Sequence, residues 1–384
     1  MPRFRCDSLS ALCPSLPGKL IFLSWILSLW LSGCGGSAAP LGAEEANPAP
    51  RLLLTGNSLA KLAGWMRQES WAVLETSGLE NGKFLETASP GKSVLQWADK
   101  ATWDPKTRQF RFLGSPHYEP FKHIIYAEAD NAWRAGPLPF PPDTLVHGYE
   151  HNTIDAATGE SYFREYGTTK VFKYSPATNS WSSLPSIPSQ SIQCCGALEW
   201  FPERHGLLFV DGDWGVFFFD AGAQKWTRIA NTKVKLDANA PQCPMGSYSN
   251  FASYSPKQKV VLFGGGGSSA IYRLDASGKI TKLAKAPIEL GIGSSIVTVD
   301  PVSGKHLVFG GDKSFWEYDV SADAWRSLGA SCAPIFDAPN TPAVFDIVAA
   351  PVSTYGVIMF VKYSPGQAKV YLYKHIASTP TGQK

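Results

Sequence analysis

The densest group of side chains able to do chemistry is the segment His-Gly-Tyr-Glu-His-Asn at positions 147–152. A carboxylate beside an imidazole tunes the imidazole pKa toward neutral pH, so Glu150 with His147 or His151 could form an acid and base pair. On a strand, however, His147 and His151 would lie about 13 Å apart, because each residue advances about 3.3 Å. One metal ion cannot bind both histidines at that distance, and a metal would need partners from other repeat units. We predict no metal and no cofactor.

Acids, amides and aromatic residues also recur where apolar runs begin or end. Such a mixture suits a neutral hydroxylated ligand such as a sugar, which stacks on aromatic rings and donates hydroxyl protons to acids. The predicted ligand-binding residues are His117, Glu119, His147, Tyr149, Glu150, His151, Asp213, Trp214, Tyr248, Asn250, Asp312 and Lys313. Tyr118, Gln193, Asp211 and Asp346 occupy similar positions. For each residue taken singly, the alternative is a solvated loop surface.

Several kinds of function are disfavoured by the sequence. The formal charge is +3 and no cluster of Lys and Arg forms a stripe, so we predict no nucleic-acid partner. The glycine run 264–267 lies between two predicted strands, whereas a phosphate loop leads from a strand into a helix. The Gly-x-Ser-x-Gly and His-Glu-x-x-His motifs of hydrolases and metalloproteases do not occur.

The elements that must position these residues are revealed by an internal repeat of about 40–50 residues. Trp133, Trp181, Trp226 and Trp325 each follow a strand-like run that ends near an aromatic residue and an acid or its substitute. A further unit keeps the pattern but has Ile280 in the place of the tryptophan. Upstream in each unit, an apolar run ends in glycine, and before it a strand end leads into a turn. Many short strands joined by tight turns predict an all-β fold.

An apolar strand ending in Gly-Gly, a Tyr-Asp strand and a tryptophan about six residues later resemble the kelch motif. Gly264-Gly265 and Gly310-Gly311 match its diglycine, while the second and third units depart from it with Glu165-Tyr166-Gly167 and Val210-Asp211-Gly212. The resemblance covers Lys92 to about Ser378. It implies a kelch-like β-propeller, similar to the central domain of galactose oxidase, in which each unit is a blade of four antiparallel strands. The copper ligands of that enzyme have no counterparts that can be placed here, so copper chemistry is not expected.

Five full units begin near Lys92, Val146, Gln190, Gly246 and Ile292. A sixth, from Val344 to Ile376, lacks its last strand. Ser70–Leu74 resembles the missing tryptophan strand, so we predict that it completes the sixth blade and closes the ring, which protects the edges that an open array would expose. A helix is predicted from Asn57, with Leu59, Leu62 and Met66 on one face. The alternative is a seventh, partial blade that starts at Leu52.

The N-terminus predicts export and lipid anchoring. Basic residues precede Leu20–Leu31, an apolar run within the range of a signal peptide and too short to span a bilayer. The run Leu-Ser-Gly-Cys at 31–34 resembles the bacterial lipobox, which implies a diacylglycerol on Cys34 and a location in the cell envelope, at the periplasmic face of the outer membrane or at the cell surface. An ordinary signal peptide with a chance cysteine is the alternative. The predicted regions are a signal peptide (1–33), a disordered tether (34–50), an N-terminal segment (51–91), the propeller (92–378) and a tail (379–384).

Four cysteines remain after the signal peptide and the lipidated residue are set aside. Cys194, Cys195, Cys243 and Cys332 are an even number in an oxidising compartment, which makes them disulfide candidates. Three connectivities are open, including a strained ring between Cys194 and Cys195. The alternative is that some are buried thiols.

Two functions follow from these observations, and the sequence does not separate them. The first is an envelope-anchored binding module that recognises a glycan or a protein partner through polar loops around the centre of the ring. The second is a sugar-active enzyme, such as a mutarotase or epimerase, by resemblance to periplasmic kelch proteins that act on sialic acid. A third role, in envelope assembly, would require exposed apolar patches on the blade edges.

Overall fold

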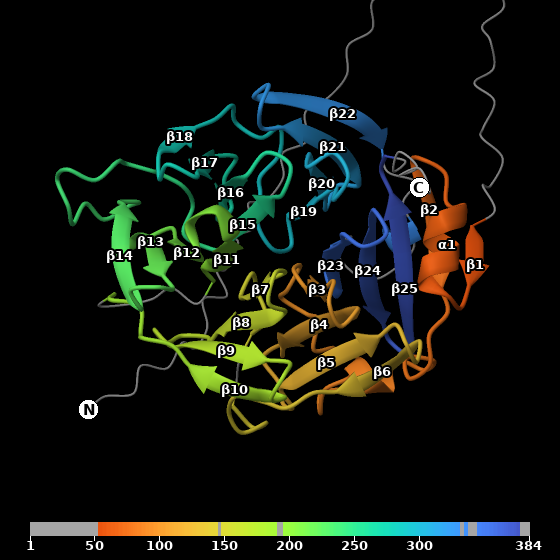
Figure 1. The fold of residues 1–384 in the computed structure, drawn as a ribbon. Helices are drawn as coiled ribbons and strands as arrows, with labels where there is room; N and C mark the ends of the chain where they lie inside the picture. Colours follow the sequence, from red (N-terminus) through yellow and green to blue (C-terminus); the bar gives the residue numbers. More distant parts are fainter. Residues whose placement is uncertain (1–52, 145–146, 190–194, 331–333, 337–343, 377–384) are drawn as a thin grey trace, which may run out of the picture. The chain divides into compact units, whose positions relative to one another are not determined.

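The computed structural model describes residues 53–144, 147–189, 195–330, 334–336 and 344–376. Within them, six β-sheets form a closed ring around one centre (Figure 1). Each innermost strand contacts the innermost strand of the next sheet, and the sixth contacts the first, so the circle has no gap. The predicted propeller of six blades with four antiparallel strands each is confirmed, and a seventh blade is not formed.

The first three blades lie in chain order, each listed from its innermost to its outermost strand. Blade one contains β3 (Thr102–Asp104), β4 (Gln109–Gly114), β5 (Lys122–Ala127) and β6 (Ala132–Ala135). Blade two contains β7 (Asn152–Asp155), β8 (Glu160–Arg164), β9 (Val171–Ser175) and β10 (Ser180–Ser183). Blade three contains β11 (Ala197–Phe201), β12 (Gly206–Asp211), β13 (Gly215–Asp220) and β14 (Lys225–Ala230).

The last three blades include the one that joins the two ends of the ring. Blade four contains β15 (Asn250–Ser255), β16 (Val260–Gly265), β17 (Ile271–Asp275) and β18 (Ile280–Lys282). Blade five contains β19 (Ser295–Val299), β20 (His306–Gly310), β21 (Ser314–Asp319) and β22 (Ala324–Ala330). Blade six contains β23 (Ile347–Val352), β24 (Val357–Ser364), β25 (Gln367–Lys374) and β2 (Ser70–Leu74).

Blade six closes the ring as the sequence predicts. The strand β2 pairs antiparallel with β25, and Trp71 lies opposite Tyr373 with 4.7 Å between ring centroids. The segment before it adds a fifth strand, β1 (Leu54–Gly56), parallel to β2. The helix α1 (Leu59–Trp65) connects β1 and β2 and buries Leu59, Leu62 and Ala63. The residues from Leu54 onward therefore extend blade six instead of starting another blade.

The repeated tryptophans share one structural role. In four blades the tryptophan of the outermost strand lies directly opposite an aromatic residue of the third strand; these pairs are Tyr126–Trp133, Tyr174–Trp181, Phe219–Trp226 and Tyr318–Trp325. Their ring centroids are 4.5 to 5.4 Å apart. In blade four, Leu274 lies opposite Ile280 in the same register. The sequence repeat thus reflects one cross-strand apolar contact at the same place in each of these five blades, and the contact is aromatic in four of them.

The diglycine of the repeat also has a steric cause. At the end of β16, a Cβ atom on Gly264 would lie 2.2 Å from the Ala270 carbonyl oxygen, and Gly265 has a φ of +69°. Both positions exclude an ordinary side chain. The resemblance at these residues therefore rests on how closely β16 approaches the start of β17.

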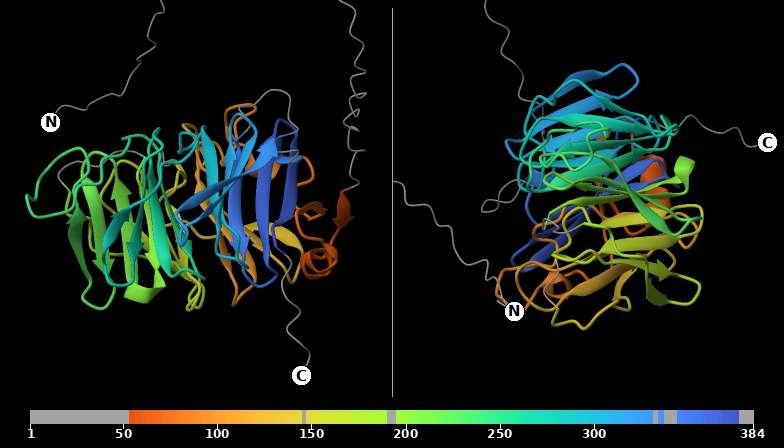
Figure 2. Two further views of the ribbon diagram at one scale, coloured as in Figure 1. Left: turned by 90° about the horizontal axis from the view of Figure 1, so that it is seen from above. Right: turned by 90° about the vertical axis from the view of Figure 1, so that its left-hand side faces the viewer.

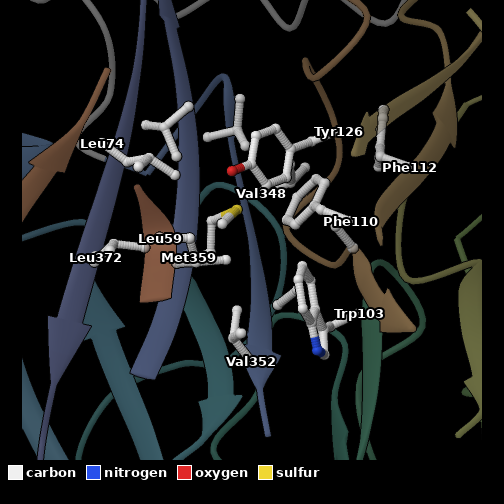
Figure 3. Close-up of a cluster of buried hydrophobic side chains, with 14 of the residues drawn as sticks. Leu59, Leu74, Trp103, Phe110, Phe112, Tyr126, Val348, Val352, Met359 and Leu372 are labelled. Carbon is white, nitrogen blue, oxygen red and sulfur yellow. The ribbon is translucent and has the colours of Figure 1, made fainter. Parts of the chain in front are cut away.

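Neighbouring blades are held together by apolar clusters between their faces. The cluster between blades six and one is built from both ends of the chain (Figure 3), with Met359 and Leu372 from blade six, Phe110 and Trp103 from blade one and Leu59 from α1. All five are almost completely buried. Burying apolar surface from residues about 300 positions apart is what makes ring closure favourable.

Three short 3₁₀ turns complete the regular structure of the described residues, at Lys83–Leu85, Pro202–Arg204 and Pro334–Phe336. In the part of the chain that the structure describes, no helix has the length and apolar character needed to cross a membrane. Cys195 is disulfide-bonded, while Cys194 and Cys332 lie outside the described residues. Cys243 is a free thiol, buried beside Tyr272, so the prediction of a disulfide is wrong for this residue. Burial raises its pKa to about 12.

Candidate functional site

The loops that lead into the innermost strands meet at one end of the ring, together with the loops between the second and third strands of each blade. We call this end the loop face. Here the segments just before β3 and β7 bond to each other through a parallel bridge at Ala98–Tyr149. Parallel bridges at Glu150–Ala197 and Lys100–Ala349 join the same segments to the innermost strands β11 and β23. The Asn250 amide also donates to the Cys195 carbonyl oxygen at 3.0 Å. The blades therefore converge tightly below the loop face.

Lys100 crosses the centre of the ring. Its ammonium donates to the carbonyl oxygens of Leu198 (2.7 Å) in blade three and Ala252 (2.9 Å) in blade four. It also pairs with Glu199 and lies 3.6 Å from Glu150. Although burial opposes its charge, the carboxylates of Glu199 and Glu150 raise the pKa of Lys100. One side chain thus joins blades one, two, three and four.

A pair of carboxyl groups lies beside this lysine. Asp99 and Glu150 are buried and hydrogen-bonded to each other. Burial raises the pKa of Asp99 to about 6, and burial together with the charge of Asp99 raises the pKa of Glu150 well above its usual range. Two carboxylates cannot hydrogen-bond to each other without a proton, so the pair shares one proton and keeps one negative charge beside Lys100. One further oxygen of each group, Asp99 Oδ1 and Glu150 Oε1, has no partner among the described residues.

Aromatic and imidazole rings gather on the loop face next to these groups. We call them the ring cluster, and its members are Phe345, Trp97, His117, His147, Tyr149, Tyr166 and Tyr248. Centroid distances are 4.7 Å between Trp97 and Phe345 and 4.3 Å between His117 and His147. The hydroxyl groups of Tyr149 and Tyr248 are hydrogen-bonded. Segments before blades one, two, four and six and loops of blades one and two contribute to this one surface.

The ring cluster combines exposed rings with buried polar atoms. Tyr248 is 48% exposed and His117 is also exposed. Beside them, His147 Nδ1 and the Ser249 hydroxyl are buried, and the described residues offer neither a hydrogen-bond partner. Burial, with the neighbouring His117, lowers the pKa of His147 to about 3, and burial also lowers that of His117. Both imidazoles are therefore neutral at pH 7 and able to donate and accept.

Backbone strain marks the same segments. Trp97, Tyr149, Ser249 and Asp346 all have φ between +32° and +64°, and each precedes the innermost strand of a different blade. Residues other than glycine adopt this conformation at a cost, which the surrounding structure must outweigh. Each such residue turns the chain sharply where it enters the ring, and this turn places the adjoining side chains on the loop face.

The structure brings together only part of the predicted binding set. His117, His147, Tyr149 and Tyr248 belong to the ring cluster, and Glu150 lies beside Lys100. Asp213 and Trp214 occupy a loop of blade three, where Asp213 accepts a hydrogen bond from Ser247 and pairs with Lys233. Three further predicted ligand-binding residues are exposed on loops of blades one and five: Glu119, Asp312 and Lys313.

Two predicted ligand contacts serve the scaffold instead. Asn250 is fully buried; its Oδ1 accepts from the Gly212 amide, and its Nδ2 donates to the carbonyl oxygens of Gly246 and Gly264. His151 is fully buried with its Nε2 3.2 Å from Arg164 Nη2. Glu150 interacts with Asp99 and Lys100, so the acid pair involves a second carboxyl group in place of a histidine.

Sequence reasoning missed the residues at the centre: Trp97, Asp99, Lys100, Tyr166, Glu199 and Phe345. For Asp99, the sequence contained one signal. Asp99 stands five residues before Asp104, and Glu150 stands five residues before Asp155. Asp104 and Asp155 both end the innermost strand of their blade. Equivalent places in adjacent blades lie at the same depth in the ring, so the repeat itself predicts that Asp99 and Glu150 meet.

No family model matches this sequence, and no curated protein matches it in sequence. Among solved structures, a Bacteroides thetaiotaomicron protein of unknown function from structural genomics is similar with a TM-score of 0.52 and 12% identity, over 79% of this chain and 75% of that one. A streptogramin B lyase structure is similar with a TM-score of 0.42 and 10% identity, over 69% and 76% of the two chains. At these identities the likeness concerns the propeller fold alone.

Proposed function

We propose that this propeller is a binding module that recognises a glycan through the ring cluster on its loop face. The observation that carries the proposal is the combination of an exposed Tyr248 with buried, unpartnered donors and acceptors at His147 and Ser249. Sugars present apolar ring faces and hydroxyl groups together, and such a surface meets both needs. The neutral imidazoles favour an uncharged ligand over a phosphate.

Glycan-array binding of the mature chain with Cys34→Ser tests this proposal. Tyr248→Ala removes an exposed stacking surface, so we expect affinity for the bound glycan to fall about tenfold, the upper range for one aromatic contact. Trp65→Ala is the control, since Trp65 is an aromatic residue that is 65% exposed on α1 and is not part of the ring cluster. An array without binding, or an equal loss in both variants, would argue against a glycan site here.

A second candidate function is favoured by the shared proton of Asp99 and Glu150. A protonated carboxyl beside a carboxylate can donate one proton and accept another, which is the requirement for opening and closing a sugar ring. Lys100 and Glu199 hold this pair in place from neighbouring blades. We therefore propose sugar anomerisation as the alternative activity of the same face.

NMR exchange between the anomers of a bound sugar distinguishes an enzyme from a binder. Glu150→Gln keeps a hydrogen-bond donor toward Asp99 but removes the transferable proton. If the pair is catalytic, the exchange rate falls about 100-fold or more while glycan affinity stays within twofold. Wild-type protein that leaves the spontaneous exchange rate unchanged would reject the enzymatic alternative and retain the binding proposal.

We also propose that a lipid on Cys34 anchors the protein in a bacterial cell envelope. The support is the apolar run before Leu-Ser-Gly-Cys at 31–34. Mass spectrometry of the purified full-length product should show a mature N-terminus at Cys34 carrying acyl chains, and Cys34→Ser should release the protein from the membrane fraction. Cleavage at another residue without lipid would identify an ordinary signal peptide.

A further inference from the structure

The segment that borders the outer edge of blade six exposes several large apolar side chains. Among the described residues, Leu53, Leu54 and Trp65 are 37%, 40% and 65% exposed. Leu53 precedes β1, Leu54 begins β1, and Trp65 ends α1. Figures 1 and 2 show these two elements outside the other strands of blade six. Single exposed apolar residues are normal, but a group on one short segment indicates a surface with a partner.

The way this segment packs does not account for the exposure. The helix α1 buries Leu59, Leu62 and Ala63 against blade six, and Trp65 is directed away from that contact. One edge of β1 pairs with β2, and no strand among the described residues pairs with the other edge. The core contact of α1 is thus complete without Trp65.

Basic residues flank the apolar ones. Lys61 and Arg67 are exposed on the same segment as Trp65. Tryptophan prefers the boundary between the acyl chains and headgroups of a bilayer, because its ring is apolar and its N–H needs a polar partner. Lysine and arginine at that level meet anionic headgroups. This composition matches a lipid surface better than the interior of a protein interface, where lysine is depleted.

The position of the segment in the chain favours the same partner. Only about 18 residues separate Cys34 from Leu53. A chain of 18 residues spans at most about 60–65 Å even when fully extended, so a lipid on Cys34 keeps this segment close to the bilayer at high effective concentration.

From these observations we infer that Leu53, Leu54, Lys61, Trp65 and Arg67 form a rim surface that docks on the bilayer. The inference rests on the proposed Cys34 anchor. Because β1 is the outermost strand of blade six, docking stands the propeller on its edge and leaves the loop face open to the side. The lipid supplies attachment, and the rim surface supplies orientation.

Fluorescence quenching by brominated lipid tests the docking. The full-length lipidated protein is reconstituted in vesicles of phosphatidylethanolamine and phosphatidylglycerol, with or without bromine on the acyl chains. The Trp65 signal is obtained by subtracting the emission of Trp65→Phe from that of the wild type. We expect bromine to reduce this signal at least twofold, whereas the signal obtained in the same way from Trp214→Phe, on the loop face, should not change. An unquenched Trp65 in protein that carries the lipid would overturn the inference.

A second measurement separates failure of docking from failure of anchoring. The Cys34→Ser protein should bind the same vesicles weakly, and Lys61→Ala or Arg67→Ala should each lower that affinity about fivefold. If mass spectrometry finds no lipid but this binding persists, anchoring is rejected and docking stands. The inference is wrong if the unlipidated protein does not bind vesicles but forms a dimer in sedimentation that Trp65→Phe abolishes. The rim surface would then bind a second copy of the chain.

Discussion

At the scale of single residues, the centre of the ring depends on a lysine placed among carboxylates. The Lys100 ammonium bonds two carbonyl oxygens and one carboxylate from blades three and four. A buried ion pair of this type adds little stability compared with apolar side chains in the place of both partners. Removal of only one partner is costly, because it leaves a buried charge without compensation. The function of Lys100 is therefore to neutralise a centre that several acids share.

Lys100→Ala should lower the free energy of unfolding by about 3–5 kcal/mol, because Glu199 and two carbonyl oxygens lose their buried partner. Urea unfolding followed by circular dichroism measures the loss. Lys170→Ala is the control, since Lys170 pairs with Glu165 while 59% exposed and should cost at most about 1 kcal/mol. Equal losses in the two variants would contradict the central role of Lys100.

The hydrogen bonds of Glu317 predict how the free energy of unfolding depends on pH. Burial alone would raise the pKa of Glu317, but hydrogen bonds from Arg326, His375 and Lys305 lower this pKa from 4.5 to about 2. A lowered folded-state pKa contributes stability that is present above pH 4.5 and is lost as the pH falls toward 2. The stability difference between wild type and Glu317→Gln should therefore be constant from pH 5 to 7 and shrink below about pH 4.5. Unfolding midpoints across this range measure it; a constant difference at pH 2.5 would refute the assignment.

At the scale of elements, a tryptophan on the fourth strand of five blades packs against an aromatic residue of the third strand. In blade six, that contact comes from the N-terminal side of the chain, where Trp71 packs against Tyr373, Phe360 and Phe309. Phe309 belongs to blade five, so this tryptophan stabilises both the closing strand and the boundary between two blades.

Trp71→Ala should lower the free energy of unfolding by about 2–4 kcal/mol, somewhat less than for a fully buried aromatic residue. Trp65→Ala is the matched control, because Trp65 is 65% exposed on the adjacent helix and its removal should cost less than about 0.5 kcal/mol. Chemical denaturation of both variants provides the comparison. If Trp71→Ala were no more harmful than Trp65→Ala, the closing strand would not depend on this ring.

At the scale of the whole molecule, a closed ring lets every blade support two neighbours. No blade has a free inner edge among the described residues, because the contacts between innermost strands run continuously from blade one to blade six and back. We therefore expect the propeller to unfold as one cooperative unit, without early loss of a terminal blade.

The buried thiol of Cys243 reports on this cooperativity. Burial and a pKa of about 12 make it unreactive in the folded state. Its alkylation should follow the same urea dependence as tryptophan fluorescence, which mass spectrometry of the peptide containing Cys243 can measure. Labelling at urea concentrations well below the fluorescence transition would show that blades three and four open separately.

The sequence alone determined the period, the six units and the closing role of Trp71, because each depends on patterns local to one unit. The tryptophans recur, and the same cross-strand contact explains every one of them. Histidine and tyrosine positions near 147–149 were also visible, since they stand just before an innermost strand.

Only the tertiary structure decided which residues the predicted site residues contact. Asp99, Lys100, Glu150 and Glu199 come from three blades and up to 100 residues of chain. The repeat relates Asp99 to Glu150, but no pattern within one unit joins Lys100 and Glu199 to them. The same holds for Asn250, whose hydrogen bonds to Gly212, Gly246 and Gly264 turn a predicted ligand contact into a scaffold residue. Repeats specify their own strands through short-range packing, whereas the centre of a ring is set by contacts between blades, which exist only after the ring has closed.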